Sequence, residues 1–321
     1  MPPNNPTAGD LHVNRPLTNW AMKWQQDQEN FIAMRAMPSL GSKHRSDDYY
    51  IYDRADWLRD AAQEREDGTE SAGGGYKLTT DTFRCKKPSF HKDVTDDERA
   101  NADDIVDPEE DAAEFVSQKL LIRRERDFAG AYMGTGIWSA DVSPTAKWNT
   151  ATGEPIKDIR LARRTVQGNT GYWPNRGIFG RDAWDALLDS DEVLDRIKGG
   201  ALSNQPAKVQ RQLLASLFEL EEIFVMDAVF NAANEGAAEA TQRMVNDVAL
   251  LYFAPATVGR KTPCAGKVFN WTGRMGATPN GMRIKRIRME HLNSWRVEGE
   301  MSFVHKVTAP ELGYFFNDTN A

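Results

Sequence analysis

The sequence has few of the residues and patterns on which many secreted, membrane and metal-binding proteins depend. It contains only two cysteines, Cys85 and Cys264, in 321 residues, which excludes a disulfide framework and a four-thiolate zinc site. No apolar run approaches the roughly 20 residues that a membrane-spanning helix requires. The first residues, Met1 to Pro6, lack the basic and then apolar order of a signal peptide. We therefore expect a soluble protein of a reducing compartment.

Signatures of catalysis are also missing from the sequence. The five histidines show no spacing typical of metal ligands. The sequence has no Gly-x-Ser-x-Gly nucleophile elbow and no Rossmann glycine fingerprint, and neither cysteine lies in a Cys-x-x-Cys pair. We predict no catalytic residue, no cofactor and no metal site, and hence no enzyme. The alternative is a soluble α+β enzyme of unknown class, whose polar cluster only the fold would bring together.

The charge balance is acidic. The chain has 40 Lys and Arg against 47 Asp and Glu, a net charge of −7 with a pI near 5.4. Because nucleic-acid binding needs clustered cations, this balance disfavours a broadly cationic DNA-binding protein. One basic stretch, Arg283–Arg288, leaves contact with phosphates open, although a solvated or interface-facing strand edge explains such a stretch as well.

Residues 93–114 hold eleven acidic residues against the single Arg99. Their spacing lacks the order of a calcium loop, so we regard metal binding as the lesser interpretation. The run instead leads into a helix, because Asp107 is a good N-cap and Pro108 suits the first turn. We predict a helix over residues 108–133, roughly 37 Å long.

The apolar residues of this helix predict which of its sides is buried. Phe115, Ile122 and Ala129 fall on one line. We expect this line to face the C-terminal strands around Val297–Phe303, which alternate large and polar residues.

The N-terminal region, residues 1–45, is broken by prolines and predicts an arm. A disordered tail is the alternative, but the arm is rich in aromatic residues, unlike such tails. Trp20, Trp24 and Phe31 have no core of their own in this arm. We therefore predict that they contact another subunit.

Residues 46–92 predict a long β-hairpin with a glycine tip. The run Gly73-Gly74-Gly75 precedes Tyr76, which begins a segment rich in β-favouring residues. A phosphate-binding loop would need Gly-Lys-Ser/Thr after the glycines, and none follows. The hairpin has too few apolar residues for its own core, so we predict that Gly73, Gly74, Gly75 and Tyr76 contact a neighbouring subunit.

The region 155–255 predicts a compact α/β unit, and the region 265–316 is rich in strands. A helix is expected from Pro155 to Gly168, because its apolar residues have helical spacing. The other elements expected here are helices over 182–188, 190–198 and 209–217 and strands over 177–180, 222–227, 247–254, 283–288 and 295–304.

The order of these parts, together with the sequence of several short segments, resembles the major capsid protein of tailed bacteriophages, which has the Hong Kong 97-type capsid fold. Asp103–Ala129 is similar to the spine-helix region of this family, and Thr170–Lys198 is similar to its axial-domain helices. Val225–Ala228 and the closing Ala309–Phe316 fit as well.

The resemblance implies an α+β fold with a peripheral domain, an axial α/β domain, an extended β-hairpin loop and an N-terminal arm. The expected boundaries are 1–45 for the arm, 46–92 for the extended loop, 93–154 for the peripheral domain with its spine helix, 155–290 for the axial domain, and 291–321 for the C-terminal peripheral strands.

The resemblance also implies a structural protein of the virion that assembles in the cytoplasm of a bacterial host. Its partners would be further copies of itself, in the hexamers and pentamers of an icosahedral shell around double-stranded DNA, contacted weakly and without sequence preference. We further expect a separate scaffolding protein, a portal and a decoration protein, and no membrane. The family's Lys–Asn crosslinking cannot be mapped onto Lys77, Lys86 or Lys87, so we do not expect it.

Overall fold

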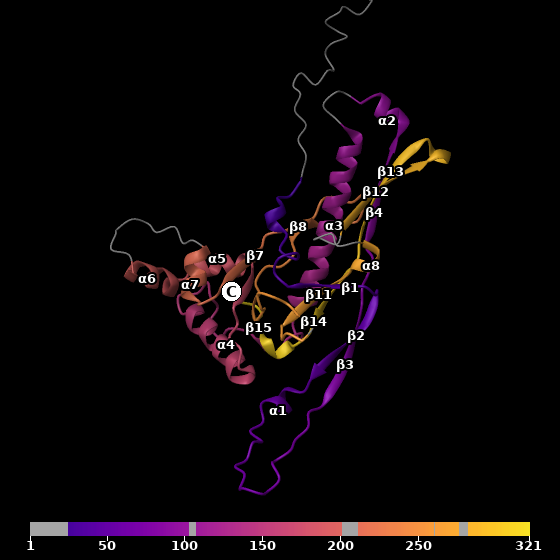
Figure 1. Ribbon diagram of the computed structural model, residues 1–321. Helices are drawn as coiled ribbons and strands as arrows, with labels where there is room; N and C mark the ends of the chain where they lie inside the picture. Colours follow the sequence, from indigo (N-terminus) through magenta and orange to yellow (C-terminus); the bar gives the residue numbers. More distant parts are fainter. Residues whose placement is uncertain (1–24, 103–106, 201–210, 260, 276–281) are drawn as a thin grey trace, which may run out of the picture.

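The computed structural model describes residues 25–102, 107–200, 211–259, 261–275 and 282–321. A central body carries two projections (Figure 1). One is a wing formed by a long helix and a sheet, and the other is a narrow β-hairpin that points the opposite way. No described helix is long and apolar enough to cross a membrane.

The wing is built around helix α3, Pro108–Tyr132. Its N-terminus is capped as predicted, because the Asp107 carboxylate accepts hydrogen bonds from the backbone N–H groups of Glu109, at 2.9 Å, and Glu110, at 3.3 Å. The helix lies on a three-stranded antiparallel sheet in the order β12–β13–β4. The bounds of these strands are Met282–Met289 for β12, Ser294–Met301 for β13 and Ser89–Thr95 for β4.

The buried side of α3 is not the predicted one. Phe115 is 45% exposed. The buried residues instead recur every four positions, at Ala112, Val116, Leu120, Arg124, Phe128 and Tyr132, with Glu125 buried beside this line. The prediction failed because Arg124 interrupts the apolar residues of this line, and the uninterrupted line through Phe115 looked more hydrophobic.

The predicted partner of the helix, the C-terminal strand region, is correct. A Cβ atom placed on Gly299 of β13 would lie 2.5 Å from Cγ1 of Val116 and 2.7 Å from Cδ1 of Leu120. The helix and the strand therefore approach so closely that position 299 has no room for a side chain.

The predicted strand over residues 295–304 is two strands. It breaks at Ser302, where β13 leaves the wing and β14 begins a second sheet in the order β1–β11–β14. Strands β11 and β14 are antiparallel, and β1 is parallel to β11. The bounds are Ser39–Ser42 for β1, Gly266–Trp271 for β11 and Phe303–Val307 for β14.

A five-stranded mixed sheet forms the centre of the body, in the order β5–β15–β10–β6–β7. Its strands are β5 (Ala140–Val142), β15 (Gly313–Phe316), β10 (Ala249–Tyr252), β6 (Arg176–Gly180) and β7 (Glu222–Met226). Four helices cover one face of this sheet (Figure 1): α4 (Pro155–Thr170), α5 (Arg181–Asp189), α6 (Asp191–Gly200) and α7 (Arg211–Leu217). Helix α4 ends at Thr170, and not at Gly168 as predicted, and is capped by Gly171, whose φ of +80° favours glycine.

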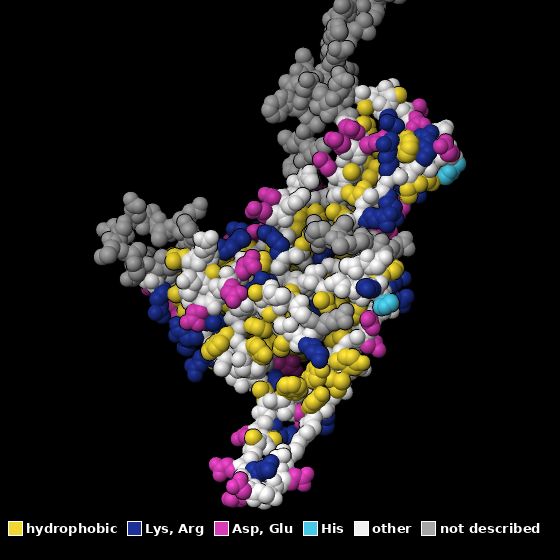
Figure 2. Space-filling view, in the orientation of Figure 1, with side chains coloured by type: hydrophobic (Ala, Val, Ile, Leu, Met, Phe, Trp, Pro, Cys, Tyr) yellow, Lys and Arg dark blue, Asp and Glu magenta, His cyan; other side chains and the backbone are white. Residues whose placement is uncertain are grey.

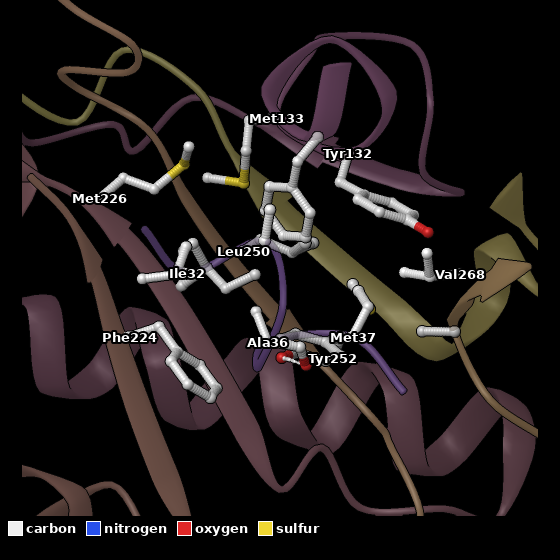
Figure 3. Close-up of a cluster of buried hydrophobic side chains, with 14 of the residues drawn as sticks. Ile32, Ala36, Met37, Tyr132, Met133, Phe224, Met226, Leu250, Tyr252 and Val268 are labelled. Atoms are coloured by element: carbon white, nitrogen blue, oxygen red, sulfur yellow. Dashed lines mark hydrogen bonds between the residues drawn. The ribbon is translucent and has the colours of Figure 1, made fainter. Parts of the chain in front are cut away.

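Successive residues of the central strands belong to two different cores. Ile178, Leu250 and Phe315 lie in the core shared with α3, whereas their chain neighbours Phe179, Leu251 and Phe316 lie in the core under the helices α4 to α7. This alternation is the two-residue period of a strand buried on both faces. Figure 3 shows the first of these cores.

The remaining elements are short. They are η1 (Gln28–Asn30), α1 (Arg54–Trp57), α2 (Asp96–Ala100), β8 (Val229–Asn231), β9 (Thr241–Arg243), α8 (Thr272–Met275), η2 (Glu290–Leu292) and η3 (Pro310–Leu312), besides the hairpin strands β2 (Ser46–Tyr52) and β3 (Leu78–Arg84). The expected boundary at residue 290 lies between the paired strands β12 and β13. Strand β15, expected among the peripheral strands, pairs within the central sheet.

The segment after η1 is part of the core of its own chain, although the sequence predicts an arm through residue 45 that contacts another subunit. Phe31 is only 4% exposed, and Ile32 and Met37 are buried beside α3 (Figure 3). The Glu125 carboxylate accepts hydrogen bonds from the backbone N–H groups of Ile32, at 3.2 Å, and Ala33, at 2.9 Å. Burial raises the pKa of Glu125 to about 7, although these two hydrogen bonds favour its charged form.

Leu120→Ala should destabilise the unassembled subunit by about 3 kcal/mol, because it leaves a cavity between α3 and β13. Phe115→Ala is the matched control on the same helix and should cost less than about 1 kcal/mol, since Phe115 is largely exposed. Urea unfolding followed by circular dichroism measures both. A larger loss for Phe115→Ala would place the originally predicted side of the helix against the strands.

The free energy of unfolding of the subunit should also depend on pH because of Glu125. Its folded pKa of about 7 lies above the unfolded value of about 4.3, so the folded chain binds the proton more tightly. The free energy of unfolding contributed by this group therefore falls as the pH rises from about 4.3 to about 7. Glu125→Gln should remove this slope in urea titrations between these pH values. Identical slopes in the two proteins would refute the assignment.

Candidate interaction surfaces

The projecting hairpin is fixed firmly where it leaves the body. Strands β2 and β3 pair antiparallel along their whole length. Near their base, Phe83 stacks on Phe269 of β11, with ring centres 4.1 Å apart. The Tyr49 hydroxyl donates to Asp81 at 2.7 Å, and Nζ of Lys306 lies 3.0 Å from the same carboxylate. These contacts set the direction in which the hairpin points.

The glycine run is not at the tip of the hairpin. The far turn is closed by the N–H of Thr69, which donates to the carbonyl of Glu66, and it contains Gly68 with a φ of +83°. Gly73, Gly74 and Gly75 lie on the limb that returns to β3. No atom lies within 4 Å of a Cβ placed on any of these three glycines. Their neighbourhood is therefore open in the isolated subunit.

A hydrophobic patch lies in the middle of the hairpin, where the pairing of β2 and β3 ends at Tyr52 and Leu78. Tyr52, Trp57 and Tyr76 form an aromatic cluster with ring centres 5.6 to 5.8 Å apart. Trp57 is nevertheless 64% exposed and Tyr76 is 61% exposed. With the exposed residues beside them they form what we call the hairpin patch: Tyr50, Tyr52, Trp57, Leu58, Tyr76 and Leu78.

The sequence analysis identified only Tyr76 of this patch. It missed Trp57 and Leu58, although both follow the aromatic stretch Tyr49–Tyr52 within a segment that has too few apolar residues for a core. An exposed apolar patch on a projection is typical of a surface that a partner covers.

The acidic run of residues 93–114 pairs with the basic strands of the wing. Arg288 makes two hydrogen bonds to the Asp96 carboxylate, at 2.7 and 2.8 Å. Arg296 makes the same pair of bonds to Asp93, whose pKa is lowered mainly by them. The carboxylates of both residues thus have cationic partners in the wing. These two carboxylates of the acidic run therefore help to hold the wing together.

The basic stretch 283–288 is largely neutralised in the same way. Arg286 reaches Glu109 at 2.7 Å and stacks on the Trp295 ring at 4.0 Å. Lys285 lies 2.6 Å from Glu300. These pairings favour the interpretation as a strand edge over contact with nucleic-acid phosphates, and β12 is indeed an edge strand of its sheet.

Glu300 joins three segments of the wing. Its buried carboxylate lies 2.6 Å from Nζ of Lys285 on β12 and 2.6 Å from Nζ of Lys87, just before β4. Burial alone would raise the pKa of Glu300, but the two lysines outweigh it and hold the pKa at about 2. Lys87 is therefore held in an ion pair within its own subunit.

Three residues of the arm were predicted to contact another subunit, and for Phe31 this prediction is wrong. Phe31 is buried within its own chain, and the two residues after it are hydrogen-bonded to Glu125 of α3. Trp20 and Trp24 lie outside the described residues.

Comparison with known proteins identifies a family. The model of the family described as phage major capsid protein E matches residues 139–312, which is more than half of the chain. The comparison with curated proteins finds no match.

Solved structures of phage proteins resemble the chain over nearly its whole length. A phage-related protein from Bordetella bronchiseptica RB50 gives a TM-score of 0.67 at 15% identity, covering 92% of this chain and 94% of that one. The capsid of the cyanophage P-SCSP1u gives 0.61 at 11% identity, with 99% and 96% covered. The capsid of the Myoviridae phage XM1 gives 0.58 at 9% identity, with 97% and 98% covered. The fold is thus the Hong Kong 97-type capsid fold, as the sequence predicts.

Two N-terminal deletions should behave differently. Removing residues 1–40 deletes Phe31 to Met37 from the core and cuts into β1, so the subunit should fail to fold. Removing residues 1–24 leaves this core intact and should preserve the folded subunit. Circular dichroism and thermal unfolding distinguish the two. A stable subunit without residues 1–40 would show that the segment is a free arm after all.

Proposed function

We infer the function from the family: the chain belongs to the phage major capsid protein E family and is thus a structural protein of phage heads that self-assembles into the shell of the virion. We propose that its copies form the hexamers and pentamers of an icosahedral head around double-stranded DNA. We propose assembly in the cytoplasm of a bacterial host, with a separate scaffolding protein, a portal and a decoration protein as partners. The family favours this structural role over the alternative of an α+β enzyme.

The hairpin patch is the observation that carries this proposal beyond the family. Its aromatic residues project away from the body, where the described part of the chain does not cover them. Such a patch stabilises an assembly if each copy buries it on the next, because a head-to-tail contact can repeat until a ring closes. We propose that this loop, including Gly73, Gly74, Gly75 and Tyr76, contacts a neighbouring subunit.

We propose a division of labour between the parts that follows their cores. The wing, with α3 and the sheet β12–β13–β4, serves as the peripheral domain, and the central sheet with helices α4 to α7 serves as the axial domain. The separate core under α4 to α7 supports this division. Strand β12 then belongs to the peripheral domain and β15 to the axial domain, because strands that share a sheet move together.

The proposed contact with packaged DNA is weak and independent of sequence. The net charge of −7 opposes strong binding, and Lys285, Arg286 and Arg288 already have acidic partners. For the N-terminal region we propose that Trp20 and Trp24 pack against a neighbouring subunit. The protein lacking residues 1–24 tests this, since it should fold and yet assemble poorly.

The double substitution Trp57→Ala/Tyr76→Ala should reduce shell assembly strongly while leaving the subunit folded. It removes apolar area that only a neighbour can bury, so the subunit concentration needed for assembly should rise by more than about tenfold. Light scattering and negative-stain imaging measure assembly, and circular dichroism measures folding.

Thr69→Ala is the matched control on the same loop, since it removes a polar side chain at the far turn. Its assembly should remain close to that of the unaltered protein. Normal shells from the double variant would exclude the hairpin patch as a subunit contact.

A further inference from the structure

The outward side of helix α4 combines cations with exposed apolar area. Lys157, Arg160, Leu161 and Arg164 lie on one face because they are spaced three or four residues apart. Figure 2 shows Lys and Arg side chains gathered along this side of the body. Leu161, in the middle of this face, is 58% exposed.

The turn after α4 carries two exposed aromatic residues, of which Tyr172 packs one side of its ring on Phe253, with ring centres 4.9 Å apart. Tyr172 and Trp173 are both exposed, the latter to 48%. The guanidinium of Arg163 lies over the Trp173 ring at 5.2 Å and also pairs with Glu219. The Trp173 ring is thus held in place while its outer face stays open. We call the residues Arg160, Leu161, Arg164, Tyr172 and Trp173 the basic face.

The two arginines at the centre of the basic face have only long-range compensation among the described residues, since Arg160 helps to lower the pKa of Glu219 without forming an ion pair with it. Lys157 pairs with Glu154. Arg160 and Arg164, by contrast, have no carboxylate within ion-pair distance among the described residues. This differs from the wing, where Arg288 and Arg296 each make two bonds to one carboxylate.

The opposite charge lies at the corner where α5 meets α6. Asp189, Asp191 and Asp195 are exposed there, and no ion pair involves them in the described part of the chain. We call these three residues the acidic corner. Within one copy α4 and α6 are held side by side, because the Ile156 N–H at the start of α4 donates to the Glu192 carboxylate of α6 at 2.9 Å. Among the described residues no ion pair joins the acidic corner to Arg160 or Arg164 of the same chain.

We propose that the basic face of one copy docks on the acidic corner of a second copy. This inference rests on the proposed self-assembly of the chain. Every copy carries both surfaces, so the contact is head-to-tail and can repeat around a ring. Arg160 and Arg164 would meet the three aspartates, while Leu161 and Trp173 would lose their exposure to water.

Nucleic acid is the less suitable occupant of this surface. Proteins that bind DNA through its backbone use about six to ten phosphate contacts, and the basic face offers two arginines without an ion-pair partner among the described residues. Leu161 and Trp173 would also gain little against phosphates, whereas a protein surface can cover them.

A charge-swap experiment tests the proposal. Arg160→Glu/Arg164→Glu alone, and Asp191→Arg/Asp195→Arg alone, should each place like charges across the contact and raise the concentration needed for assembly by more than about tenfold. The protein with all four substitutions should regain assembly, because the attraction is restored with reversed sign. Lys43→Glu/Lys261→Glu, which reverses two exposed charges elsewhere, is the matched control and should assemble normally.

Light scattering, imaging and circular dichroism of the same samples separate the outcomes. If the protein with all four substitutions folded but did not regain assembly, the proposal would be overturned. So would normal shells from Arg160→Glu/Arg164→Glu, and if such shells retained less DNA the surface would be assigned to nucleic acid instead. If the unaltered protein and the control variant both formed no shells, the result would contradict the proposed function itself and not only this contact.

Discussion

Strands β6, β10 and β15 at the centre of the body are covered on both faces, and the positions of the other parts follow from this double burial. Helices α4 to α7 close one face, while α3 and the segment Phe31–Met37 close the other. Because each face needs a complete apolar cover, the N-terminal segment is drawn into the core. Its backbone N–H groups then need acceptors, and Glu125 provides them at the cost of burying a carboxylate.

The wing is stabilised differently, by charges in place of a broad core. Strands β4, β12 and β13 exchange ion pairs such as Arg296 with Asp93, and Glu300 with two lysines. Removing one member of a buried pair costs more than the pair contributes, because the other charge stays behind. This arrangement holds a narrow sheet against a single helix, and the close approach at Gly299 leaves little freedom between them.

Beyond its base, the hairpin is stabilised neither by an apolar core, as the body is, nor by ion pairs of the kind found in the wing. The stacked Phe83 and Phe269 fix its root, but Trp57 and Tyr76 gain nothing from the body to which they are attached. We propose that other copies of the chain bury these two side chains, so that the hairpin patch stabilises the assembly and not the subunit. We propose the same for the exposed side chains of Leu161 on α4 and Trp173 after it.

The sequence by itself determined the local elements and the family-like order of parts. Asp107 and Pro108 set the start of α3, and the apolar runs set strands β6, β7 and β10, because these signals act between near neighbours in the chain. Only the tertiary structure decided which side of α3 is buried, that Phe31 lies in the core, and that β15 joins the central sheet. These outcomes depend on contacts between segments that are distant in the chain. Buried charged residues such as Arg124 and Glu125 also interrupt the apolar pattern from which a buried side would be predicted. The hairpin patch likewise required the fold, since exposure of Trp57 cannot be judged until the body that fails to cover it is known.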